Sequence, residues 1–210
     1  MAPTFESKRL AIVELLRGIS RYDLPHPFRV TSDGRPAAVL ILVGLSEGSG
    51  DPEILVTRRP DTIATHKGQY ALPGGMRDHA EECAEETALR ETQEEMGISA
   101  SLIEVVGRLP EIWTPSGFTI TPVIGVLRKM SNEVEVVPNP SEVDTWFWCP
   151  LARLRDEGVY FREEREITFE GKSRIVPVDV YQIDSHRIWG ATGAILRNLI
   201  ARLEKSESGI

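Results

Sequence analysis

LPGGMRDHAEECAEETALRETQEEMGI, residues 72–98, joins a glycine-rich bend to a strongly acidic segment. Residues 82–96 have a helical composition, and a glycine follows them as a stop signal. Helical neighbours lie three and four residues apart, so we expect Glu91, Glu94 and Glu95 on one face. Carboxylates this close repel one another unless a cation lies among them. The stretch therefore predicts a metal site on one face of a helix.

The glycines before the helix help to separate this interpretation from a simpler one. Taken alone, RETQEE fits a solvent-exposed helix face, as most glutamate-rich helices do. Gly74 and Gly75 allow the backbone to bend tightly in front of the helix. Clustered carboxylates can then hold Mg²⁺ or Mn²⁺, which take oxygen ligands, neutralise phosphate oxygens and acidify water. The combination favours the metal site.

The composition is that of an ordinary globular protein. The chain has 210 residues, of which 41% are hydrophobic and 27% charged, enough for one large domain with a full core. The net charge of -8 argues against a protein that coats nucleic acid. The two cysteines form no CxxC pair, which indicates a reducing compartment. The longest apolar run, which starts at Ala37, is far below the roughly twenty residues of a membrane helix. We therefore expect a cytoplasmic protein that binds neither nucleic acid nor membranes.

The hydrophobic pattern predicts helices at both ends of the chain and strands between them. Helices are expected at residues 5–19 and from Ser185 onward. Strands or extended segments are expected at PAAVLILVGL, EILVTRR, GQYALPGG, SLIEVVGRL, TITPVIGVL, EVEVV and EVDTWFWCPL, with a hairpin in ITFEGKSRIVPVDVYQI that turns at residues 170–172. The mixture predicts an α/β fold, with a mixed sheet between helices. We divide the chain into an N-terminal helix and connector (1–30), one main domain (31–204) and a frayed tail (205–210).

The acidic helix and its glycines resemble the Nudix box of the hydrolases that act on nucleoside diphosphates linked to another group. That box reads Gly, five residues, Glu, seven residues, Arg-Glu, an apolar residue, any residue, Glu-Glu, any residue, Gly and an apolar residue. The matching residues are Arg90, Glu91, Glu94, Glu95, Gly97 and Ile98, and Thr92 takes the apolar position. The resemblance implies the Nudix α/β/α sandwich with a mixed β-sheet, here with an extra N-terminal helix and a long C-terminal helix.

The first glutamate of the box has two candidates. Counted forward from Gly75 it is Glu81, and counted back from Arg90 it is Glu82, so the chain has one residue more than the general pattern. We prefer Glu81 as an additional metal ligand, because the PGG bend fixes the loop side and a helix start absorbs an extra residue easily. Arg90 is expected on another side of the helix, where it holds a carboxylate or a loop.

Segments outside the box resemble the coenzyme A pyrophosphatase branch of the Nudix hydrolases. These segments are LVTRRP...HKGQYALPGG, GRLPEIWTPSGFTITPVIG, SEVDTWFWCPL and RIWGATGAIL, and that branch also has the extra residue in its box. The resemblance implies cleavage of CoA to 3',5'-ADP and 4'-phosphopantetheine with a divalent metal. This chain departs from the branch at Ile63 and Ala64, where a Leu-Arg pair is usual, and a missing arginine there would remove a phosphate contact.

Several residues near the box are candidates for substrate binding, and Gly74 and Gly75 of the bend are among them. Arg58 and Arg59 end a strand beside the expected cleft, and we expect at least one to bind phosphate; the alternative is that both face solvent. His66 either meets a phosphate or completes the hydrogen bonds of its loop. Trp113 and Phe118 are expected in a loop, where they would contact a base or a pantetheine arm.

Glu142 follows the loop VPNPS, a region from which some Nudix enzymes take a base or an extra ligand. We predict that water, activated by the metal, attacks one phosphorus of a pyrophosphate without a covalent enzyme intermediate, with Glu142 or a box glutamate as the base. Two alternatives stay open. One is a pyrophosphatase for ADP-ribose, another nucleotide sugar or an oxidised nucleotide. The other is a silent Nudix fold that binds nucleotides as a sensor, which the intact glutamates argue against. A homodimer is also possible.

Overall fold

The computed structural model describes residues 3–20, 34–62, 67–169 and 172–208. Its elements are α1 (Phe5–Ser20), β1 (Arg35–Leu45), β2 (Pro52–Arg58), β3 (Tyr70–Ala71), β4 (Gly74–Met76), α2 (Ala84–Met96), β5 (Ile103–Arg108), β6 (Ile112–Trp113), β7 (Phe118–Leu127), β8 (Thr145–Pro150), β9 (Tyr160–Phe169), β10 (Lys172–Ile183), β11 (His186–Trp189) and α3 (Gly190–Glu207). Short 3-10 helices lie at Ala100–Leu102, Ser131–Glu133 and Leu151–Arg155. Among the helices of these described ranges, none is both long and apolar enough to cross a membrane.

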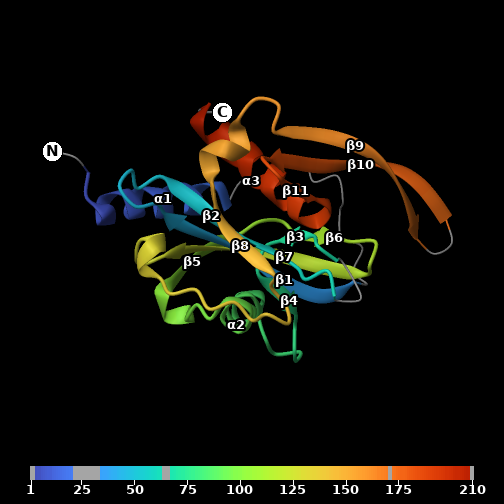
Figure 1. Cartoon of the computed structure of the whole chain (residues 1–210), viewed down its shortest axis with the longest axis horizontal. Coiled ribbons are helices and arrows are strands. Elements are labelled where there is room, and N and C mark those ends of the chain that lie inside the picture. The colour runs from blue at the N-terminus through green and yellow to red at the C-terminus, as the bar shows by residue number, and fades with distance from the viewer. Residues whose placement is uncertain (1–2, 21–33, 63–66, 170–171, 209–210) are drawn as a thin grey trace.

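A mixed sheet lies between two layers of helices. Its strand order is β3-β2-β1-β7-β5, with β4 paired to β1, β6 to β7 and β8 to β2. Strands β1 and β7 are parallel. Along β1, Leu40 and Leu42 face the core beneath α2, whereas Ile41 and Val43 face the core beneath α1 and α3. Figure 1 shows α2 on one side of the sheet and α1 and α3 on the other. The predicted α/β/α sandwich with both added helices is confirmed.

Near the site, β1 and β2 diverge, and the glycine-rich segment fills the gap between them. Strand β2 pairs with β1 at Ile54 and with β3 at Arg58, while β1 pairs with β4 at Val39. The other edge of β2 is paired with β8, and the other edge of β1 is paired with β7. Strands β3 and β4 therefore lie between β2 and β1. A Cβ atom on Gly74 would lie 2.3 Å from the carbonyl oxygen of Ala38. Only glycine allows this close approach, and its φ of 153° is also one that other residues rarely adopt.

The segment EVEVV, residues 133–137, is not the strand that its alternation predicts. It follows a short 3-10 helix, and the N–H of Val137 donates to the carbonyl oxygen of Met96 at the end of α2 (2.9 Å). Val134 is buried and Val136 packs against the same core as α2. The alternation therefore reflects one-sided burial against a helix, without a partner strand among the described residues.

The C-terminal part forms a second sheet with the order β11-β10-β9. The predicted hairpin is confirmed by the pairing of β9 with β10, although residues 170–171, where its turn was expected, lie outside the described residues. The last helix begins at Gly190 rather than near Ser185, because residues 186–189 pair with β10 as a strand. This tertiary pairing overrides the helical pattern. The expected frayed tail is helical as far as Glu207.

Charged side chains fasten α1 to the rest of the molecule. Glu104 of β5 accepts hydrogen bonds from Arg9 (2.6 Å) and Arg17 (2.7 Å), and Arg128 lies 3.7 Å away. The hydrogen bond from Arg9, aided by the other arginine charges, lowers the pKa of Glu104. On the other side, the buried Arg202 of α3 donates to the carbonyl oxygen of Ile19 (2.9 Å). The N-terminal helix is thus an integral part of the fold.

Candidate metal centre

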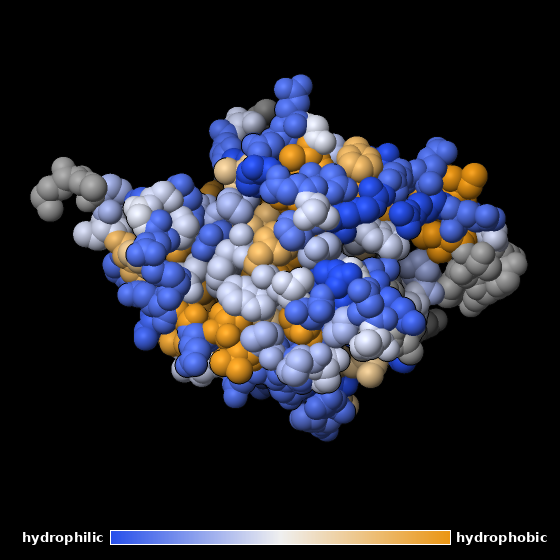
Figure 2. Space-filling model, viewed as in Figure 1, coloured by the Kyte–Doolittle hydropathy of each residue, from blue (hydrophilic) through white to orange (hydrophobic). Residues whose placement is uncertain are grey.

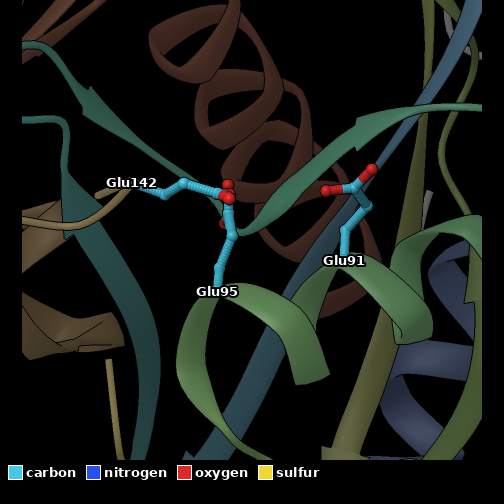
Figure 3. Close-up of side chains that lie close together, drawn as sticks. All are labelled: Glu91, Glu95 and Glu142. Carbon is cyan, nitrogen blue, oxygen red and sulfur yellow. The ribbon is translucent and has the colours of Figure 1, made fainter. Parts of the chain in front are cut away.

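Three carboxylates from two separate segments meet at one point beside the sheet. Glu91 and Glu95 belong to α2, and Glu142 belongs to the loop before β8. Each contributes one oxygen to a group whose members all lie within 4.8 Å of one another. Figure 3 shows Glu91 and Glu95 rising from the helix, while Glu142 reaches the carboxylate of Glu95 from the loop. The structure therefore brings together two of the predicted box ligands and the predicted loop residue.

The PGG bend lies against two carboxylates of this cluster. The N–H of Gly74 donates to Oε2 of Glu95 (3.2 Å). A Cβ atom on Gly75 would lie 2.4 Å from the carboxylate of Glu91, so a larger residue would displace that carboxylate from its present position. Both glycines were predicted as substrate-binding residues. In the structure their first effect is to position and accommodate the acidic side chains.

The end of α2 holds the loop that carries Glu142. The N–H of Asn139 donates to the carbonyl oxygen of Glu95 (2.8 Å), so the loop satisfies a carbonyl group that a helix end leaves open. The side chain of Asn139 accepts from the N–H of Ser141 (3.1 Å) and donates to Glu142 (3.3 Å). Asn139 thereby connects both halves of the cluster. Asn139 was not among the residues predicted from the sequence, although Asn followed two residues later by Ser is a turn signal.

Arg90 fastens the loop before α2 to the helix. It donates to the buried Glu82 (2.8 Å) and to the carbonyl oxygen of Met76 (2.9 Å), which fits the predicted role of holding a carboxylate and a loop. The hydrogen bond from Arg90 is the main reason that the pKa of Glu82 is lowered to about 2. Glu81 is exposed and lies outside the carboxylate group. The preference for Glu81 is therefore corrected: Glu82 has the box spacing to Arg90, and the extra residue lies in the loop that precedes it.

Glu94 also lies outside the group that contains Glu95. Its side chain is 54% exposed and accepts a hydrogen bond from Arg90 (3.1 Å). Residue 94 is three positions from residue 91, so helical spacing alone does not exclude it; its hydrogen bond with Arg90 is what occupies it here. The prediction that Glu94 is a metal ligand therefore stays a prediction, while Glu91 and Glu95 are the two that meet Glu142.

The cluster is electrostatically strained without a cation. Burial, together with the charges of Glu91 and Glu142, raises the pKa of Glu95 to about 8, although the N–H of Gly74 and the charge of Arg59 oppose the rise. Burial also raises the pKa of Glu91. A divalent cation would remove the repulsion that raises these values. Three carboxylate oxygens form the hard donor set that Mg²⁺ and Mn²⁺ prefer, so the residues present fit such an ion.

The structure separates the two neighbouring arginines. Arg58 is engaged by Asp61 (2.9 Å) and Asp144 (2.5 Å), and these hydrogen bonds raise its pKa. Arg59 lies close enough to Glu95 for its charge to act on that carboxylate, and its Nε is buried without a hydrogen-bond partner among the described residues. Of the two, Arg59 is the one whose guanidinium is available to an anionic ligand beside the cluster.

The remaining candidates lie elsewhere or outside the described residues. His66 is one of residues 63–66, which the structure does not describe. Trp113 and Phe118 are strand residues of β6 and β7, not loop residues. The guanidinium of Arg35 covers the ring of Phe118 at 4.1 Å. By strand alternation Phe118 shares the face of Ile120, which packs in the core beneath α1 and α3, so it points away from α2.

Comparisons with known proteins agree with this geometry. A family model of the NUDIX domain matches residues 34–168. An uncharacterized Nudix hydrolase of Yersinia enterocolitica, NudL, is 36% identical over 184 residues, which cover 86% of this chain and 89% of the relative. Nudix hydrolase 15, a mitochondrial protein of Arabidopsis thaliana, is 34% identical over 77% of this chain and 57% of its own length. The crystal structure of a MutT/nudix family protein from Enterococcus faecalis superposes with a TM-score of 0.53 at 16% identity, over 98% of this chain and 76% of that one, and shows the same fold. The chain belongs to the Nudix family and is a hydrolase of pyrophosphate bonds.

Proposed function

We propose that this Nudix hydrolase uses Mg²⁺ or Mn²⁺, held by Glu91, Glu95 and Glu142, to cleave the pyrophosphate of CoA or a CoA derivative. The observation that carries the metal assignment is the convergence of three carboxylate oxygens within 4.8 Å, one of them from the buried Glu95. Three negative charges this close together are costly in free energy unless a cation neutralises them. The products would be 3',5'-ADP and 4'-phosphopantetheine.

The residues around the cluster divide the work of hydrolysis. A bound divalent cation would supply charge neutralisation on the phosphates and lower the pKa of water. Glu142 lies on the loop side of the cluster and is only partly buried. One of its oxygens would hold the metal, and the other is our candidate to accept the proton of the attacking water. A box glutamate is the alternative base. Arg59 would donate to a phosphate oxygen of the leaving group, since a guanidinium forms strong, charge-assisted hydrogen bonds to phosphate and the Nε of Arg59 has no partner among the described residues.

The substrate assignment rests on the segments outside the box that resemble the CoA pyrophosphatase branch. The chain has Ala64 at the position where that branch usually has arginine. Arg59, which precedes this position on the same connection, would provide a positive charge for the phosphates. ADP-ribose, a nucleotide sugar or an oxidised nucleotide is the second candidate, and it would use the same metal and the same base.

The experiment is a substrate panel of CoA, ADP-ribose, nucleotide sugars and oxidised nucleoside triphosphates, each with Mg²⁺ or Mn²⁺, with products identified by mass. We expect CoA to give the highest kcat/KM. A preference for ADP-ribose would overturn the substrate. Nucleotide binding without hydrolysis of any compound would support the sensor instead.

A single turnover in ¹⁸O-labelled water tests the chemistry. Direct attack by water places one label in one of the two phosphate products in the first turnover. First-turnover products that lack solvent label, or a trapped phosphoryl- or nucleotidyl-enzyme, would contradict a mechanism without a covalent intermediate.

A further inference from the structure

Strand β9 has a free edge in the part of the chain that the structure describes. It is ten residues long and pairs only with β10, so it is the last strand of the order β11-β10-β9. Figure 1 shows it on the outer side of the hairpin, away from the main sheet. The N–H and C=O groups of such an edge can pair with a further strand unless its side chains prevent it.

The side chains along this edge carry both signs of charge. The run Phe161–Ile167 reads FREEREI, and Arg162, Glu164 and Glu166 are exposed. Figure 2 shows the hairpin as mostly hydrophilic along its length. Charged residues often protect an edge strand from association, and that is the simplest explanation of this composition. The order of the charges, however, differs from that of an edge strand whose charges only repel a second strand.

The run is nearly self-complementary when a second copy approaches in the antiparallel direction. In a pair centred on Glu164, Arg162 lies opposite Glu166 and Glu163 lies opposite Arg165, each pair occurring twice by symmetry. Phe161 then lies opposite Ile167, so apolar residues close both ends. The single unfavourable pair is Glu164 with its own copy. Opposite charges and apolar pairs on directly facing residues stabilise a sheet.

The neighbouring registers are worse, and this makes the pairing specific. Facing residues must lie on the same side of the sheet, so a symmetric register can shift only to a centre one residue along the strand. A centre at Arg165 places that arginine opposite its own copy and Glu164 opposite Glu166. A centre at Glu163 places Glu163 opposite its own copy and Phe161 opposite Arg165. Only the centre at Glu164 pairs most charges with their opposites.

We propose that β9 is an interaction surface whose partner is β9 of a second copy of this chain. The two three-stranded sheets would join into one continuous antiparallel sheet across a two-fold axis. Some of these side chains also contact their own chain, such as Arg162 with Asp179 (3.0 Å) and Glu163 with Arg165 (3.3 Å). Glu163 also accepts a hydrogen bond from Arg187 through its other oxygen. Each carboxylate oxygen has two lone pairs and each guanidinium has five donors, so both sets of contacts can coexist.

The test measures the mass of the protein in solution as a function of concentration, by sedimentation velocity. The wild-type chain should approach twice the monomer mass as concentration rises. Glu166→Arg should weaken the dimer about tenfold or more, because Arg162 then faces an arginine at two places. Glu135→Arg makes the same charge change at an exposed site outside the hairpin and should leave the dimer intact. A monomeric wild type at every concentration would overturn the proposal.

Mixing two variants gives the decisive result. Arg162→Glu alone should also weaken the dimer, because it places glutamates opposite each other. An equimolar mixture of Arg162→Glu with Glu166→Arg restores opposite charges at both positions, so a heterodimer should form although neither variant pairs with itself. In Arg162→Glu, Asp179 keeps the hydroxyl of Tyr160 as a partner (2.7 Å), and circular dichroism checks its fold. No heterodimer on mixing would show that β9 is not the interface.

A third variant strengthens the dimer and does not depend on disruption. Glu164→Gln removes the single like-charge pair and should tighten the dimer several-fold, with a smaller change at high salt. An unchanged dissociation constant in this variant would contradict the register centred on Glu164.

Discussion

Two acidic sites on opposite parts of the molecule have opposite electrostatics. Glu104 is one carboxylate surrounded by Arg9, Arg17 and Arg128, and its pKa is lowered. The candidate metal centre has three carboxylates, which Arg90 beside Glu91 (3.0 Å) and the charge of Arg59 offset only in part, and its buried Glu95 has a pKa raised to about 8. The first site also contains Glu6 beside Arg9 and Glu14 beside Arg17, so three arginines balance three carboxylates. The second is left with excess negative charge by the residues around it, which is why we propose that a cation completes it. Charge balance within the chain is thus our criterion for separating a structural carboxylate from a functional one.

The largest expected effect is on hydrolysis after Glu95→Gln. This change keeps the size of the side chain but removes the buried charge, so kcat should fall about 100-fold or more while the fold survives. Steady-state kinetics with saturating Mg²⁺ measures it. Glu81→Gln is the matched control, since Glu81 is exposed and outside the carboxylate group, and it should retain wild-type kcat. An active Glu95→Gln enzyme would remove the metal assignment.

The pH dependence of stability should differ in sign between the two sites. The pKa of Glu95 is raised from 4.5 to about 8, so its stabilising contribution is present at low pH and is lost as pH rises through this range. In metal-free protein, Glu95→Gln should therefore be more stable than wild type at pH 8, by an amount on the order of a few kcal/mol, and equal at pH 4. Urea unfolding at each pH measures the difference. Added Mg²⁺ should stabilise the wild type at pH 8 but not the variant.

The two adjacent arginines at the end of β2 allow the effects of two substitutions on kcat/KM to be compared. Arg59→Ala should lower kcat/KM about 10- to 100-fold, because a charged hydrogen bond to phosphate contributes about 1.5–3 kcal/mol. Arg58→Ala breaks the contacts with Asp61 and Asp144 and should change kcat/KM less than threefold, since such partly exposed ion pairs contribute about 0–1 kcal/mol. Equal losses in both variants would mean that Arg59 has no special access to substrate.

Glu104→Gln should have the smallest effect on activity, because it should act on stability alone. Loss of the charge leaves Arg9 with weaker partners, so the free energy of unfolding should fall by about 2 kcal/mol at pH 7. The pKa of Glu104 is lowered, so its contribution is present above the unfolded-state pKa and is lost as pH falls through the folded-state value. The difference from wild type should thus vanish in acid, opposite to Glu95→Gln. A drop in kcat for the folded variant would show that the two sites are coupled.

Local pattern predicts most of the fold but only part of the site. The strands with apolar runs and the three helices follow from periodicity, and the i, i+4 spacing of Glu91 and Glu95 predicts their shared face. The same spacing does not predict that the side chain of Glu94 forms its hydrogen bond with Arg90. EVEVV fails as a strand because its hydrogen-bond partner is a helix end far away in the sequence. Residues 186–189 fail as helix for a similar reason, because β10 pairs with them.

The choice between near-equivalent neighbours also needs three-dimensional contacts. Glu81 and Glu82 differ by one position in a loop, and only the contact of Glu82 with Arg90 identifies the box residue. Arg58 and Arg59 look alike in sequence, yet aspartates at positions 61 and 144 neutralise only the first. Glu142 was predicted by family resemblance, whereas Asn139, which positions it, becomes visible only through the hydrogen bonds of its turn.

The loop that closes the end of α2 would make the proposed metal binding a local folding event. The amides of Val137 and Asn139 bond to carbonyl groups of the last helical turn, so opening of this loop frees the helix end and withdraws Glu142 in one step. A ligand that needs Glu142 stabilises the closed state by RT ln(1 + c/Kd), where c is the free ligand concentration, so the stabilisation grows with ligand concentration. Amide hydrogen exchange at these two positions should therefore slow as Mg²⁺ is added, while exchange along β5 around Glu104 stays constant. The loop would then report occupancy of the site before any substrate is bound.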